Sequence, residues 1–176
     1  RIRKKKHQVL LELFINIIEI KIKLKFMNTL NIPQAVYDML QRSFSRVERS
    51  DCGRIFVHLC SCTIEIDFSG EDNQDIQMQL RFPKLSSKKL VRFAYDACLV
   101  LNPSSLSKLL VVNDGTDEVL IAFLNDSFYS NDDASDFVCE GLNILQATYM
   151  QVDEFMSEYF GLNSDEEVEI ESIIRD

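Results

Sequence analysis

Five short apolar runs between residues 55 and 124 constrain the fold of this chain more than any other feature of its sequence. They lie at 55–59, 64–68, 76–82, 109–112 and 119–124. The first three alternate apolar and other residues, a period of two that is typical of strands with one buried face. The alternation changes phase around 60–63, which predicts either a turn between two short strands or a bulge in one bent strand.

A tight hairpin joins the last two runs. Asp114-Gly115 stands between them, and Asp-Gly between apolar runs is the strongest short-range hairpin signal. Helical spacing predicts helices over 33–48, 88–101 and 134–160, the last ending at Gly161. The order α-β-β-β-α-β-β-α predicts an α+β fold, in which helices pack on an antiparallel sheet of about five strands.

Charge divides the chain into three parts. Residues 1–26 carry eight Lys or Arg against two acids, whereas the rest carries 11 against 26, within a net charge of −9. We therefore expect a basic, apolar extension at 1–26, a single α+β domain at 27–162 and an acidic tail at 163–176. Two interpretations of the extension stay open. It is either sequence outside the natural protein, which then starts at Met27, or a basic amphipathic arm that lies on anionic lipid.

Composition excludes several classes of function. An acidic body repels the phosphate backbone, so we expect no nucleic-acid partner. The apolar part of the extension is too short and too charged to span a membrane, and no membrane is expected for the body of the chain. The five cysteines lack metal-ligand spacing and indicate reduced thiols in the cytoplasm. No glycine-rich phosphate loop occurs, and we expect neither a metal nor a cofactor.

Catalytic residues are scarce, and we expect no enzyme. His58 and Cys60 share one face of a predicted strand, which is commonplace for strand neighbours and weak support for a nucleophile–base pair. The acidic clusters 114–118 and 131–133 lack the ligand pattern of a calcium loop. They are interpreted as the hairpin turn and the negatively charged start of the last helix. An enzyme that uses acids such as Asp67 and Glu71 stays as a minor alternative.

The chain resembles the class I chaperones of bacterial type III secretion over residues 31–160. The features that carry the resemblance are size, acidity and element order: the helix 33–48, the strands within 55–82, the helix 88–101, the hairpin 109–124 and the helix 134–160. The resemblance implies a cytoplasmic, non-enzymatic virulence chaperone. Such a protein binds the extended N-terminal segment of a secreted effector and keeps it competent for export.

The resemblance also implies two surfaces. Apolar side chains expected to bind the effector segment are Phe44, Val57, Leu59, Ile121 and Phe123. A homodimer or heterodimer is expected to form through the second helix, at Leu90, Phe93, Ala94 and Ala97. The alternative is a generic protein–protein interaction or scaffold domain with a similar α+β sandwich fold.

Overall fold

The structure is a computed structural model that describes residues 31–115 and 117–161, without the side chain of Asp114. The chain divides into two units, Arg1–Asn31 and Ile32–Asp176. All the described helices and strands belong to the second unit. The predicted extension at 1–26 and acidic tail at 163–176 lie outside the described residues.

The described residues form three α-helices, six strands and one short 3₁₀ helix, in the order α-β-β-β-β-α-β-β-α. The elements are α2 (Ile32–Ser43), β1 (Val47–Arg49), β2 (Ile55–His58), β3 (Thr63–Ser69), η1 (Glu71–Asn73), β4 (Asp75–Lys84), α3 (Lys88–Leu101), β5 (Lys108–Asp114), β6 (Asp117–Ser127) and α4 (Asn131–Phe160). All pairings in the sheet are antiparallel. The predicted α+β fold is thus confirmed, with one strand more than expected.

The extra strand replaces the end of the first predicted helix. α2 ends at Ser43, and Val47 pairs with Val57 across the sheet. The Arg46 carbonyl accepts a hydrogen bond from the His58 amide (3.0 Å). Helical spacing alone would have continued the helix to residue 48. Pairing with β2 satisfies these backbone groups instead, which is a tertiary effect that overrides local preference.

The change of phase near residue 60 is a turn between two strands. The Leu59 amide donates to the Cys62 carbonyl (2.8 Å), and β2 and β3 pair on either side of this turn. The predicted Asp-Gly hairpin is also confirmed, since Asp114 pairs with Asp117 and Gly115 takes a positive φ of 76°. Both strands of this hairpin are longer than the apolar runs that predicted them.

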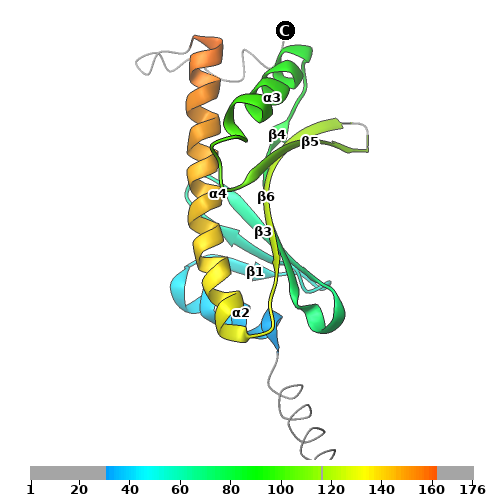
Figure 1. Cartoon of the computed structure of the whole chain (residues 1–176), viewed down its shortest axis with the longest axis vertical. Coiled ribbons are helices and arrows are strands. Elements are labelled where there is room, and N and C mark those ends of the chain that lie inside the picture. Colours follow the sequence, from blue (N-terminus) through cyan, green and yellow to red (C-terminus); the bar gives the residue numbers. More distant parts are fainter. Residues whose placement is uncertain (1–30, 116, 162–176) are drawn as a thin grey trace, which may run out of the picture. The chain divides into compact units, whose positions relative to one another are not determined.

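The strand order is β1-β2-β3-β4-β6-β5, and α4 runs along one face of this sheet (Figure 1). α2 lies beside the N-terminal half of α4 and α3 beside its C-terminal half. Helix and sheet pack closely at Gly141, because a Cβ atom there would lie 2.6 Å from Met78 Sδ. Ile66 and Leu124 pair with Met78 from the two neighbouring strands, so these residues share its face.

An aromatic cluster fixes α3 against the end of α4. The ring of Phe93 on α3 lies 5.5–5.7 Å from the rings of Phe155, Tyr159 and Phe160. The Tyr159 hydroxyl donates to Asp96 Oδ2 (2.8 Å), a second link between the helices. Aromatic pairs at these separations stabilise packing beyond their buried area. α3 is therefore positioned by α4.

Side chains at the helix ends agree with the sequence. Ser130 caps α4 by accepting from the Asp133 amide, and Asp132 and Asp133 lie in the first turn, where the helix dipole favours negative charge. The interpretation of 131–133 as the start of the last helix is thus confirmed, although the helix begins at Asn131, earlier than predicted. Gly161 ends it with a left-handed φ of 67°.

Candidate functional site

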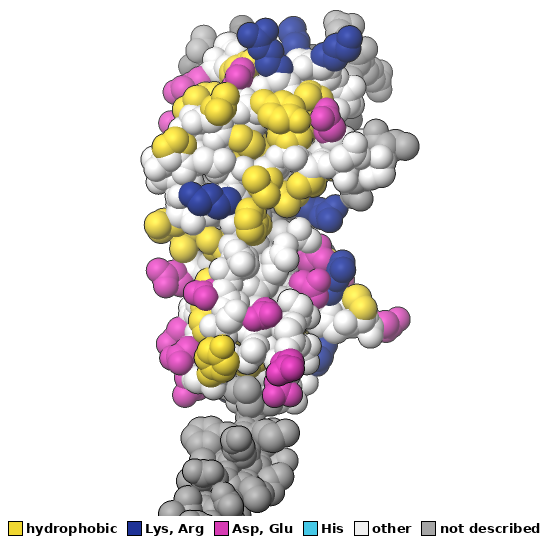
Figure 2. Space-filling model, turned by 45° about the vertical axis from the view of Figure 1, so that its right-hand side comes forward, with side chains coloured by type: hydrophobic (Ala, Val, Ile, Leu, Met, Phe, Trp, Pro, Cys, Tyr) yellow, Lys and Arg dark blue, Asp and Glu magenta, His cyan; other side chains and the backbone are white. Residues whose placement is uncertain are grey.

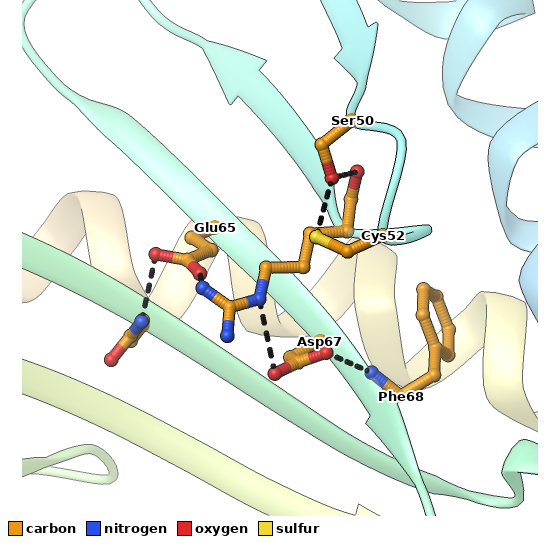
Figure 3. Close-up of polar contacts among 7 residues, drawn as sticks. Ser50, Cys52, Glu65, Asp67 and Phe68 are labelled. Carbon is orange, nitrogen blue, oxygen red and sulfur yellow. Dashed lines mark hydrogen bonds and ion pairs between the residues drawn. The ribbon is translucent and has the colours of Figure 1, made fainter.

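A polar network crosses the sheet face that points away from α4 (Figure 3). Arg54 Nη1 lies 2.8 Å from Glu65 Oε1, and Arg54 Nε lies 3.4 Å from Asp67 Oδ2. Gln79 Nε2 donates to the other Glu65 oxygen (2.8 Å), and the Phe68 amide donates to Asp67 Oδ1 (2.9 Å). The two carboxylates thus accept structural hydrogen bonds. Of the acids in the enzymatic alternative, Asp67 belongs to this network and Glu71 is exposed in η1.

His58 bonds its strand neighbours. Its Nδ1 lies 2.9 Å from Thr63 Oγ1, and its Nε2 lies 3.5 Å from Glu48 Oε1, too long for a good hydrogen bond. Nε2 is buried and has no hydrogen-bond partner among the described residues. Cys60 is exposed in the turn that follows β2. His58 thus contacts side chains of the two adjacent strands, Thr63 on β3 and Glu48 on β1, and no contact with Cys60 is among them.

A small cavity of about 160 Å³ opens between the start of α2 and the turn from β1 to β2. Its lining residues are Pro33, Arg49, Cys52, Gly53, Asp67, Phe68 and Asn73. Ligand pockets usually measure about 300–1,000 Å³, so this cavity is small for a cofactor. Among the residues that the structure describes, no group of His, Cys, Asp and Glu is arranged to hold a metal ion.

Cys52 is expected to be alkylated before Cys62, Cys98 and Cys139. Its hydrogen bond with Ser50 Oγ (3.1 Å), and next a backbone hydrogen bond at Arg54, lower the pKa of the Cys52 thiol. Burial raises the pKa of the other three thiols. Because the thiolate is the reacting species, iodoacetamide should modify Cys52 before these three, which peptide mass spectrometry measures. Ser50→Ala should slow the reaction of Cys52, and an unchanged rate at Cys52 in this variant would contradict the assignment.

The surface around α3 exposes large hydrophobic side chains. Of those exposed in the described part of the chain, five fall between residues 95 and 110: Tyr95, Leu99, Val100, Leu106 and Leu110. Leu99 and Leu106 are each 75% exposed, and Tyr95 is 51% exposed. Figure 2 shows hydrophobic side chains in the upper half of the molecule below a group of Lys and Arg, whereas Asp and Glu gather over the lower half. Clustered apolar exposure of this kind marks interaction surfaces.

Helical spacing gathers part of this surface into one stripe. Lys88, Arg92, Tyr95 and Leu99 are all exposed and follow one another at intervals of four, three and four residues, so they lie along one side of α3. We call these four residues the α3 face. Its first half is cationic and its second half is apolar, a pattern that suits an amphipathic or acidic partner.

The predicted dimer residues lie on the other side of the same helix. Phe93 is 3% exposed and packs on α4, and Ala94 and Ala97 are fully buried within the protomer. Leu90 is half-buried. Apolar residues occur on both sides of α3, and the sequence pattern alone did not show which side meets α4. A dimer through α3 would have to use exposed residues of this helix, such as those of the α3 face.

The predicted partner-binding residues are dispersed. Val57 is fully buried and Ile121 is 7% exposed, while Phe44, Leu59 and Phe123 are half-buried. Ile121 and Phe123 alternate with Ala122 and point away from α4, and Ile121 pairs with the exposed Leu110 of β5. Of the five predicted residues, the structure therefore brings two together, Ile121 and Phe123, and places Leu110 beside them.

One edge of the sheet is partly occupied. β5 is an edge strand, and the Asn102 side chain meets the backbone of Leu109 there. Asn102 Oδ1 accepts from the Leu109 amide (2.7 Å), and Asn102 Nδ2 donates to the Leu109 carbonyl (2.9 Å). An amide side chain in this position takes the place of a neighbouring strand, which is one way in which proteins protect an edge.

Comparison with known proteins shows the fold and no family. Neither a protein-family model nor a curated protein matches this chain. The solved structure of YbjN, a putative transcription regulator from E. coli, is similar with a TM-score of 0.57 and 14% identity, over 70% of this chain and 92% of that one. The Yersinia pestis type III secretion chaperone SycH, in complex with a fragment of YscM2, is also similar. That match has a TM-score of 0.33 and 11% identity, over 64% of this chain and 98% of that one.

The likeness to YbjN shows that both chains share an α+β fold, and at 14% identity it shows nothing further.

No helix within residues 31–115 and 117–161 is long and apolar enough to cross a membrane.

Proposed function

We propose that this protein is a non-enzymatic binding protein that meets other protein chains through α3 and the neighbouring strands. The observation that carries the proposal is the group of five exposed hydrophobic side chains between Tyr95 and Leu110. Monomeric proteins rarely leave such a group in water without a partner. Nucleic acid is a poorer partner, since a chain of net charge −9 repels phosphate.

The finer proposal is a secretion chaperone. In this function the α3 face pairs two protomers, and an extended effector segment lies against Leu110 and Phe123. Binding of an extended chain requires apolar pockets and open backbone, with no nucleotide or metal. The resemblance of the sequence to the type III secretion chaperones supports this function, and the observed α+β fold is the class of fold that this resemblance implies. A domain that binds a folded partner would use the same surfaces.

Leu99→Glu is expected to weaken self-association at least about tenfold, because it places a charge in a desolvated contact. The variant should fold normally, since Leu99 is 75% exposed. Light scattering over a range of concentrations measures the effect. Met150→Glu is the matched control, since Met150 is exposed on α4 outside the α3 face. A wild-type protein that stays monomeric throughout would exclude the homodimer.

The chaperone function is tested separately with a permanently unfolded probe, reduced and carboxymethylated α-lactalbumin. Fluorescence anisotropy should show binding by the full chain, with Leu110→Asp weakening it and Met150→Asp leaving it unchanged. Failure to bind the probe by a protein that still self-associates would favour the generic interaction domain.

A further inference from the structure

We infer that the acidic segment 162–176 covers the α3 face in the free protein and competes there with a protein partner. The inference rests on the proposed function of that face as a protein-binding surface. It identifies the occupant as a segment of the same chain that lies outside the described residues. Its basis is charge, position and chain length.

Charge favours this pairing. Residues 162–176 contain six acidic residues and one arginine, together with apolar residues such as Val168, Ile170 and Ile173. α3 opens with the exposed cations Lys88, Lys89 and Arg92 and continues with the exposed Tyr95 and Leu99. A segment that is both acidic and apolar therefore complements the α3 face in both halves. On the face shown in Figure 2, Asp and Glu outnumber Lys and Arg in the lower half, and like charges there repel such a segment.

Position brings the two together. α4 ends at Phe160, whose ring lies 5.7 Å from that of Phe93 on α3. Tyr159 bonds Asp96, which in turn lies 4.0 Å from the Arg92 guanidinium. The chain thus leaves α4 beside the cationic half of the α3 face. An attached segment reaches such a nearby surface at a high effective concentration, so weak contacts are enough to hold it.

The segment is long enough. Lys88 and Leu99 are eleven residues apart in one helix, which corresponds to about 16 Å along its axis. Fifteen residues follow Gly161, and an extended chain of that length reaches up to about 50 Å. The segment can therefore pass the cations first and still reach Tyr95 and Leu99. A partner that binds the α3 face has to displace it.

Zero-length carbodiimide cross-linking of the full chain tests the contact directly. In dilute protein we expect amide bonds between Lys88 or Lys89 and a carboxylate of residues 165–171, within one chain, mapped by peptide mass spectrometry. Cross-links from these acids to Lys84 or Lys108 alone would overturn the inference. Cross-links found only between two chains would also overturn it, and would assign the acidic segment to the partner protomer.

Neutral variants of the full chain test the competition. In the tail variant, four acids of the segment become glutamine: Glu166, Glu167, Glu169 and Glu171. In the matched control the same change in charge is made at exposed acids elsewhere: Asp51→Asn, Glu71→Gln, Asp136→Asn and Glu140→Gln. We expect the tail variant to tighten self-association about fivefold or more and the control to have no such effect. High salt should strengthen the self-association of the wild type more than that of the tail variant, because salt screens the attraction between the acidic segment and the cations of α3.

The outcomes separate this inference from the proposed function. Equal effects of the tail variant and the control would mean a general charge effect and would overturn the inference, as would no effect of either. If Leu99→Glu still abolished self-association in those cases, the proposed function would stand without the tail. If Leu99→Glu changed nothing, the α3 face would not be a binding surface, whatever the acidic segment does.

Discussion

Gly141→Val is expected to lower the free energy of unfolding by about 2–3 kcal/mol, because it overfills the contact between α4 and the sheet. A Cβ atom at this position would lie 2.6 Å from Met78 Sδ and 3.4 Å from Leu124 Cδ1. A branched side chain adds further atoms at the same place, so α4 has to move away from β4 and β6. Urea denaturation with an unchanged m-value measures the loss.

Two related variants make this prediction specific. Gly141→Ala should change stability by less than about 1 kcal/mol, because alanine favours the helix and the end of the Met78 side chain can rotate away. Met78→Ala alone should cost about 2–5 kcal/mol through the cavity that it leaves. In the double variant Gly141→Val with Met78→Ala, valine occupies part of that cavity, so the two losses should not add. Strict additivity would show that residue 141 does not meet Met78.

Arg54→Met is expected to lower the free energy of unfolding by about 1–2 kcal/mol, because it leaves the Glu65 carboxylate without its ionic partner. The Glu65 side chain is only 11% exposed, whereas that of Arg54 is 46% exposed. Removal of one partner from a fully buried pair would cost more, and access of water to Arg54 reduces the effect. Gln79 still donates to Glu65 in this variant.

The double variant Arg54→Met with Glu65→Met should recover most of that stability, since replacement of both charges by apolar groups removes the unpaired carboxylate. Arg42→Met, at an exposed arginine near the end of α2, should change stability by less than about 0.5 kcal/mol. An equal loss in Arg42→Met and Arg54→Met would argue that only net charge matters. If the double variant were less stable than Arg54→Met, the attraction between Arg54 and Glu65 would outweigh the cost of removing the two charges from water.

The sequence by itself determined the class of fold. Alternation at residues 76–82, the Asp-Gly hairpin and the glycine at 161 each reflect a local rule of backbone geometry, and the structure confirms all three. These features depend on neighbours within a few residues, so the chain itself contains the information. The absence of a helix at residues 44–48 is different. Val47 joins the sheet because β2 offers it backbone partners, and only the tertiary structure brings them together.

Only the tertiary structure decided which apolar residues form surface and which form core. α3 carries apolar side chains on two sides, and the aromatic cluster at the end of α4 buries Phe93, Ala94 and Ala97 while it leaves Tyr95 and Leu99 in water. The same holds for the strands: Val57 on β2 faces the core, whereas Leu110 on β5, which pairs with Ile121 on β6, is exposed. Hydrophobic spacing defines a stripe on a helix or a strand. Which stripe is buried depends on the element packed against it, far away in the sequence.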